Sequence, residues 1–302
     1  MRVTLNMFSG RPNPTWQLSR RQASELVERV KEEGARIASD EPQRLGFRGF
    51  TVDADLEDLV LQPTVAVHFV VPPPAAAPAV KARRRREGRA AAQVEARQAA
   101  EMELTDWMLR TAPPTVADQV LEAANSAIRE PQTAEEARVM TTVVAEKGTI
   151  PDLSGARCEP FLTPIQIAFW DNPPVRFRNN CYNYATNYAS NTMAQPGRRS
   201  RHIYSAFECE KVSAAAKSDG YIGNCEGRVR VVALGIWPGF DFHWWRLHPG
   251  GFWAHKIGTS PVFQQDNSGL VLGNGSTPAN CDRGPYMEFC GFFFAPLGVE
   301  VL

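Results

Sequence analysis

The sequence predicts an α+β protein whose two halves are built differently. Short stretches alternate apolar and polar residues, which is typical of half-buried strands. Capped amphipathic helices lie between these stretches. All six cysteines fall after residue 157. We therefore divide the chain into an N-terminal α+β region at 1–72, a linker with connecting helices at 73–150, and a C-terminal domain at 151–302.

The N-terminal region opens on a predicted strand at residues 3–7, where apolar residues alternate before a turn at 9–14. A second strand follows the turn. Ser19 and Gln22 then match a capping box, which predicts the start of a helix. Further predicted strands lie at residues 45–52 and 64–71.

A proline run at residues 72–78 and a run at 81–89 with six basic residues follow. Proline lacks an amide donor and favours extended backbone, so we expect an exposed linker here. Leu104, Trp107 and Met108 have helical spacing, and a second helical pattern covers residues 116–128. These helices are expected to connect or brace the two halves.

The C-terminal domain carries a cysteine at the predicted start of a helix. Asn179 or Asn180 is suited to be the N-cap of a helix that opens at Cys181. A helix N-terminus favours the thiolate, and the Cys181 amide is a candidate oxyanion donor. The pattern therefore predicts a nucleophilic thiol, with a buried core cysteine as the alternative interpretation.

Two histidines lie downstream on a predicted hairpin. A three-residue loop centred on Pro249 would place His243 directly opposite His255. A two-residue loop at 249–250 would instead pair His243 with Lys256 and separate the imidazoles. We favour the first register, because proline cannot take the positive φ that the two-residue turns require.

Residues 180–185, followed by a histidine strand and a second polar residue on the next strand, resemble the papain-like superfamily, in particular its NlpC/P60 and CHAP branch. The resemblance implies a cysteine-bearing helix packed on an antiparallel sheet, through residues 229–234, 242–247, 252–256 and 289–294. It also implies Cys181 as nucleophile, His243 as base and His255 as orienting residue. Tyr182 departs from the family, where a small residue follows the cysteine. Residues 8–14 and 289–293 are also similar to segments of uncharacterised bacterial proteins.

This resemblance implies a cysteine peptidase or amidase that acts through an acyl-enzyme, without a cofactor or metal. Asn180, Asp266 and Asn267 are further candidates for orienting the base or for the oxyanion site. Aromatic residues that would contact a peptide, peptidoglycan or protein substrate are Tyr182, Tyr184, Trp245 and Trp253. A bacterial effector or toxin is one expectation. A transamidase, acyltransferase or deamidase on the same core, or an inactive binding module, remains an alternative.

Composition sets further bounds on partners and compartment. The chain has 33 basic and 33 acidic residues, which gives no reason to expect nucleic acid. No apolar run approaches the roughly 18 to 20 residues of a membrane helix, and no secretory signal is recognisable. We expect a cytoplasmic protein, or one exported without a recognisable signal peptide. If Cys181 stays free, at most two disulfides form and one other thiol is left over.

Overall fold

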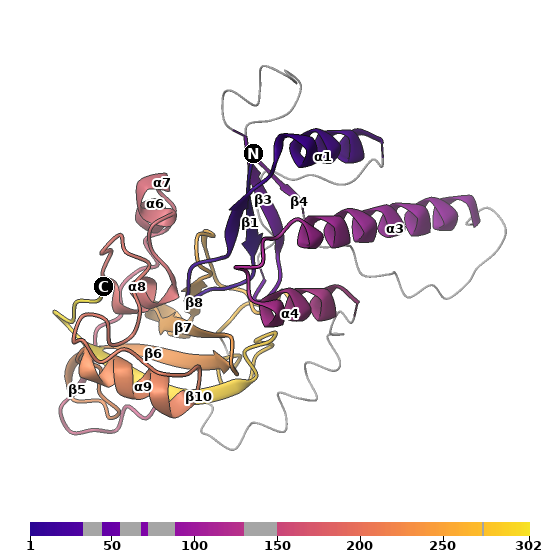
Figure 1. Ribbon diagram of the computed structural model, residues 1–302. Helices are drawn as coiled ribbons and strands as arrows, with labels where there is room; N and C mark the ends of the chain where they lie inside the picture. The colour runs from indigo at the N-terminus through magenta and orange to yellow at the C-terminus, as the bar shows by residue number, and fades with distance from the viewer. Residues whose placement is uncertain (33–43, 55–67, 72–87, 130–149, 274) are drawn as a thin grey trace. The chain divides into compact units, whose positions relative to one another are not determined.

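The computed structural model describes the chain except for residues 33–43, 55–67, 72–87, 130–149 and 274 (Figure 1). Contacts divide the described residues into two units. Unit 1 is drawn from Met1–Met7, Asn13–Pro42 and Phe47–Pro131, and unit 2 from Phe8–Pro12, Gln43–Gly46 and Gln132–Leu302. Each unit has its own sheet and helices, so the predicted mixed α+β class is confirmed. The predicted proline run at 72–78 and most of the basic run at 81–89 lie outside the described residues, and residues 88 and 89 begin helix α3.

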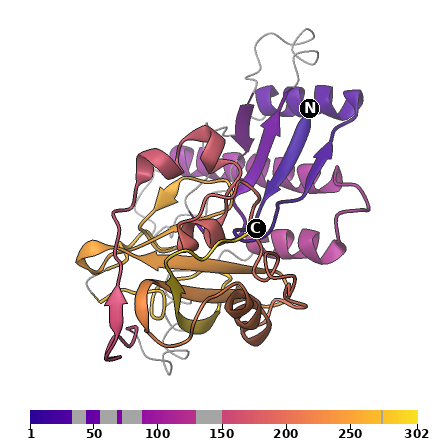
Figure 2. The ribbon, with the colours of Figure 1, turned by 90° about the vertical axis from the view of Figure 1, so that its left-hand side faces the viewer.

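Unit 1 is a four-stranded antiparallel sheet with helices on one side (Figures 1 and 2). Its strand order is β2-β1-β3-β4, and its helices are α1, α3 and α4. The elements are β1 (Arg2–Asn6), β2 (Thr15–Gln17), α1 (Arg20–Glu32), β3 (Gly49–Asp53), β4 (His68–Val71), α3 (Gly88–Arg110) and α4 (Asp118–Arg129). The predicted capping box is present, since the amide of Gln22 donates to Ser19 Oγ and the amide of Ser19 donates to Gln22 Oε1.

One predicted strand of this region is shorter than expected. The pattern at residues 45–52 predicts a continuous strand, but β3 begins only at Gly49. Gly46 and Gly49 have φ values of 86° and 94°, in the left-handed region that interrupts an extended chain. Residues 45 and 46 belong instead to unit 2.

Unit 2 contains a six-stranded sheet in which β10-β6-β7-β8-β9 are neighbours and β5 runs parallel to the start of β6. The four strands predicted for the C-terminal domain are all present. The strands are β5 (Cys158–Pro160), β6 (Gly227–Trp237), β7 (Asp241–Leu247), β8 (Trp253–Lys256), β9 (Val262–Phe263) and β10 (Glu288–Pro296). The helices are α6 (Ile167–Trp170), α7 (Pro173–Arg176), α8 (Cys181–Thr186) and α9 (Cys209–Ser218).

The central strand β6 is buried on both faces. Val231 and Ala233 pack in one hydrophobic cluster with Trp245, whereas Val232 and Leu234 pack in another with α8 and α9. Successive side chains of a strand point to opposite faces, so a nearly continuous apolar run is needed where both faces are covered. This double burial fixes α8 and its cysteine against the interior.

Two disulfides form within unit 2, Cys158–Cys225 and Cys209–Cys290. Cys181 and Cys281 are free and buried. The expected limit of two bridges with one thiol left over beside Cys181 is therefore confirmed. The pairs are not those nearest in sequence, because the fold brings α9 to β10 and β5 to the segment before β6.

The segment Phe8–Pro12 is held in unit 2 by one carboxylate. Asp241, at the start of β7, is fully buried and accepts the backbone amides of Ser9 at 2.6 Å, Gly10 at 3.1 Å and Arg11 at 3.0 Å. The hydroxyl of Tyr286 donates to the same carboxylate at 2.6 Å. A Cβ atom on Gly10 would collide with the Phe242 ring, so this approach requires glycine. The backbone of residues 9–11 therefore has a structural role in unit 2.

Candidate functional site

Helix α8 begins at Cys181, as predicted, and its N-cap is Asn180. The side-chain oxygen of Asn180 accepts the amides of Tyr182 and Asn183, and Asn183 Oδ1 accepts the amide of Asn180 at 3.1 Å. The Asn180 Nδ2 group donates to the carbonyls of Gly10 and Ala194. Asn180 is fully buried, and these bonds use its amide for capping and anchoring.

The Cys181 thiol has no exposed surface. Its Sγ atom lies 3.9 Å from the carbonyl oxygen of Phe242. Burial, together with the charge of Asp241, raises the pKa of this thiol well above its ordinary value. The expected lowering of the thiol pKa by the helix N-terminus is thus wrong, because desolvation outweighs a dipole from a six-residue helix.

The two predicted histidines meet, but through a different register. His243 Nε2 lies 2.8 Å from His255 Nδ1. The residue opposite His255 is Trp245, and the loop is centred on Gly250, so both predicted registers are wrong. Gly250 and Gly251 take φ values near 80°, which the three-residue loop needs after Pro249. A slip of two residues keeps the histidines on the same face, so they still contact each other diagonally.

The outer nitrogen of His255 is held by a backbone group that sequence reasoning did not identify. Nε2 of His255 lies 2.8 Å from the carbonyl oxygen of Gln265. Asp266 instead caps a turn, because its Oδ1 accepts the amides of Ser268 and Leu270. A backbone carbonyl carries no residue-specific signal, so this partner could not be read from the sequence.

Asn267, the other candidate for orienting the base, also has a structural role. Asn267 Oδ1 accepts the amide of Leu45 at 2.5 Å, which holds the segment at 44–46 within unit 2. The Cys181 thiol interacts with the backbone of Trp244 and the hydroxyl of Ser9, and its Sγ atom lies near the Phe242 carbonyl. The structure also brings the two imidazoles together.

The four aromatic residues expected to contact substrate lie in the interior, with at most 2% of their surface exposed. They are Tyr182, Tyr184, Trp245 and Trp253. The hydroxyl of Tyr182 donates to Asp219 at 3.1 Å, and its ring packs against Tyr221 and Trp244. This placement corrects the expectation of an open aromatic cleft, since two apolar layers cover the sheet.

His248, which follows β7, is also buried. Its Nε2 lies 2.8 Å from the hydroxyl of Tyr184, and its Nδ1 lies 2.7 Å from the carbonyl of Thr163. Arg246 adds to this group, since its guanidinium lies 4.3 Å from the Tyr184 ring centroid and Nη1 donates to the Tyr184 carbonyl. The site thus consists of buried polar groups that are linked to one another and to the backbone within the core.

Acid is expected to weaken the fold through His255. Burial lowers its pKa from 6.5 to about 4, against the smaller opposing effects of the Gln265 carbonyl and Asp266. The unfolded chain therefore takes up the proton first, so stability present above pH 6.5 is lost progressively as the pH falls to 4. The loss from this group should be about 3 kcal/mol, measured by urea unfolding between pH 7 and pH 4.

The variant His255→Gln should show a shallower pH dependence than the unchanged protein. The exposed His202 supplies the control, since His202→Gln should leave the slope unchanged. Equal slopes in His255→Gln and the unchanged protein would show that other groups cause the acid sensitivity.

Comparisons with known proteins found one informative relative. No family model matches the chain, and no solved structure matches it. The chain is 41% identical over 133 residues to insoluble matrix shell protein 1 of the mollusc Ruditapes philippinarum. The match spans 43% of this chain and 88% of the relative.

This relative overturns three expectations from the sequence. The chain is similar to a mollusc matrix protein, so the expected membership of a bacterial papain-like family is wrong. The same similarity contradicts the expectation of a thiol hydrolase and the expectation of a protease, effector or toxin. Since no solved structure matches, the papain-like arrangement has no support beyond the α+β class. With most of the relative's length matched at this identity, the chain belongs to the family of insoluble matrix shell protein 1.

Proposed function

We propose that this protein is a non-catalytic structural module that assembles with an insoluble extracellular matrix. The observation that carries the proposal is the similarity to insoluble matrix shell protein 1 over 88% of that protein. Among the functions expected from the sequence, this proposal corresponds to the inactive binding module. Its partners would be matrix proteins or other matrix components.

The two disulfides of unit 2 support export of the protein from the cell. Two disulfides join distant parts of unit 2, closing sequence separations of 67 and 81 residues. Disulfides persist mainly in oxidising compartments, such as the extracellular space. Disulfides that close long loops also stabilise a fold, because they lower the conformational entropy of the unfolded chain. Such stabilisation suits an extracellular protein.

Among the helices that the structure describes, none combines the length and the apolar composition of a transmembrane span.

The interior of unit 2 supports a structural rather than a chemical role for Cys181. Its thiol is fully buried, and burial raises its pKa, so little thiolate is available to attack a substrate. The histidine pair and the Tyr184–His248 contact are likewise enclosed. A buried cysteine that fills core space is chemically inert.

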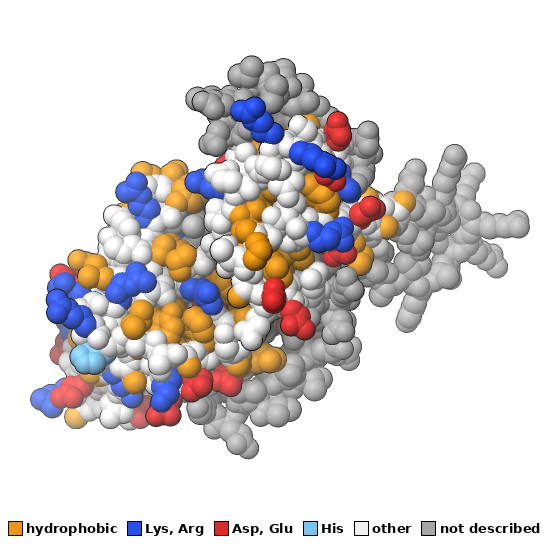
Figure 3. Space-filling model, viewed as in Figure 1, with side chains coloured by type: hydrophobic (Ala, Val, Ile, Leu, Met, Phe, Trp, Pro, Cys, Tyr) orange, Lys and Arg blue, Asp and Glu red, His pale blue; other side chains and the backbone are white. Residues whose placement is uncertain are grey.

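The surface visible in Figure 3 mixes both signs of charge with apolar side chains. This agrees with the balanced total of 33 basic and 33 acidic residues. A surface of this kind does not favour long-range attraction to a polyanion. Association with matrix would therefore depend on local sites.

Co-sedimentation with matrix tests the proposal. Purified protein should pellet with the washed insoluble matrix of Ruditapes shell and remain in the supernatant without it. Cys181→Ala should be retained to the same extent, because a buried thiol cannot contact the matrix. Protein that stays in solution beside the matrix, or retention that disappears in Cys181→Ala, would contradict the proposal.

A further inference from the structure

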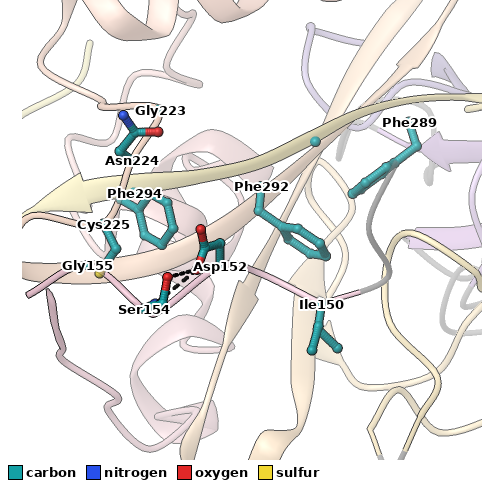
Figure 4. A pocket seen from close by; sticks show the side chains of 11 residues that line it. Ile150, Asp152, Ser154, Gly155, Gly223, Asn224, Cys225, Phe289, Phe292 and Phe294 are labelled. Carbon is teal, nitrogen blue, oxygen red and sulfur yellow. Dashed lines mark hydrogen bonds between the residues drawn. The ribbon is translucent and has the colours of Figure 1, made fainter. Parts of the chain in front are cut away.

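A groove of about 580 Å³ lies in unit 2 along the edge of β10 (Figure 4). Its size falls in the range of ordinary ligand sites. One wall is the segment that carries Ile150, Asp152 and Ser154, and another is the turn at residues 223–225. The floor consists of three phenylalanines of β10, which are Phe289, Phe292 and Phe294.

A β-bulge places these three rings together. The register between β10 and β6 shifts between Phe289 and Gly291. Such a bulge adds one residue to the alternation, so Phe289 joins Phe292 and Phe294 on the same face of the sheet. Phe292 is partly exposed and packs against Phe289 at 5.2 Å between ring centroids. Phe289 and Phe294 are buried, so the aromatic surface that the groove offers is the ring of Phe292.

The outer edge of β10 is only partly paired. Phe294 exchanges two backbone hydrogen bonds with Ile222, each 2.9 Å long. Phe292 lies two residues away, so its amide and carbonyl point toward the same edge. In the described part of the chain, no strand pairs with this edge of β10, where the groove lies. An extended chain placed there would continue the pairing that Ile222 begins.

The two disulfides hold both sides of the groove. Cys225 lines it and is bonded to Cys158, next to the wall segment. Cys290 lies between Phe289 and Gly291 and is bonded to Cys209 of α9. Preformed sites bind with a smaller loss of conformational entropy than mobile ones. The crosslinks thus support a binding role for this edge.

The charge of the groove favours a cationic ligand. Of the described residues that line it, Asp152 is the one that carries a charge. Hydrogen bonds from the hydroxyl and amide of Ser154 lower the pKa of this carboxyl, which keeps it ionised. The neighbouring Arg157 is paired with Glu226. Lys217 lies over Phe293, which packs on the other face of β10.

We propose that the β10 groove binds an extended peptide segment of a matrix protein that carries an arginine or lysine side chain. The peptide backbone would pair with Phe292, while the cationic side chain would lie over the partly exposed Phe292 ring and contact Asp152. This inference rests on the proposed matrix role in naming a protein partner. It is tested in solution, without matrix.

The probe is a fluorescent five-residue peptide with a central arginine between two valines, measured by fluorescence anisotropy. It should bind the purified full chain, and Asp152→Asn should weaken binding by about fivefold, as expected for a solvent-exposed ion pair. Glu210→Gln, at an exposed carboxylate on α9, should leave binding unchanged. A peptide with glutamate in place of arginine should bind more weakly than the parent.

Backbone pairing has its own control. Methylating the amides of the two valines should weaken binding by about tenfold, because it removes strand hydrogen bonds. No binding of the arginine peptide, equal binding of all peptides, or equal affinity in Asp152→Asn would overturn the proposal. If the peptide binds but the protein is not retained by matrix, the proposal for the groove stands and the proposed matrix role is contradicted.

Discussion

Replacing Lys256 by methionine is expected to lower the free energy of unfolding by about 3 kcal/mol. Lys256 has no exposed surface. Its ammonium group donates to the carbonyls of Arg176 and Asn179, both at 2.7 Å, and to the carbonyl of Gly258. These carbonyls come from the segment that leads into α8 and from the turn after β8, so one side chain fastens both.

Methionine fills a similar volume but offers no donors. Buried carbonyls would then lose their partners, at a cost of about 1–3 kcal/mol each, offset in part because a buried charge is also removed. Urea unfolding should show a lower midpoint with an unchanged slope. Lys211→Met, at an exposed position on α9, should leave the midpoint nearly unchanged. Similar midpoints for the two variants would mean that other groups satisfy these carbonyls.

Replacing Asp241 by asparagine is expected to destabilise unit 2 by about 3 kcal/mol. The carboxylate accepts three successive backbone amides of residues 9–11 and the hydroxyl of Tyr286. Asparagine keeps the shape, but its NH₂ group would face an amide donor. At least one buried donor would then be left without an acceptor.

Hydrogen exchange distinguishes local from global effects in this variant. The amides of Ser9, Gly10 and Arg11 should lose protection more than those of the central strand β6, because the lost acceptor binds them directly. The exposed Glu159 provides a matched change, since Glu159→Gln should alter neither exchange nor unfolding. Unchanged protection at residues 9–11 in Asp241→Asn would show that the carboxylate does not hold this segment.

Several parts of the fold could be predicted because their causes are local. The Ser19–Gln22 capping box and the Asn180 N-cap depend on residues three apart, and both form as expected. The strands of unit 2 follow from runs of apolar residues. The shared face of His243 and His255 was also predictable, because side chains of a strand repeat every two residues.

Other features depend on contacts between residues distant in sequence. Burial of Cys181 reverses the pKa shift that its helix position predicts, and nothing in residues 179–186 reports that burial. The aromatic residues near the cysteine look equally suited to a cleft or to a core. Because hydrophobic clusters cover both faces of the sheet, these aromatic residues lie in the core.

By itself, the sequence determined the α+β class, the cap and start of the cysteine helix, and the common face of the two histidines. Only the tertiary structure decided the disulfide pairs, the Asp241 anchor at Ser9–Arg11 and the exclusion of water from Cys181. The physical reason is the distance in sequence between the residues that interact. Caps and strand alternation arise from neighbours within a few residues, whereas desolvation and buried hydrogen bonds depend on how distant segments pack.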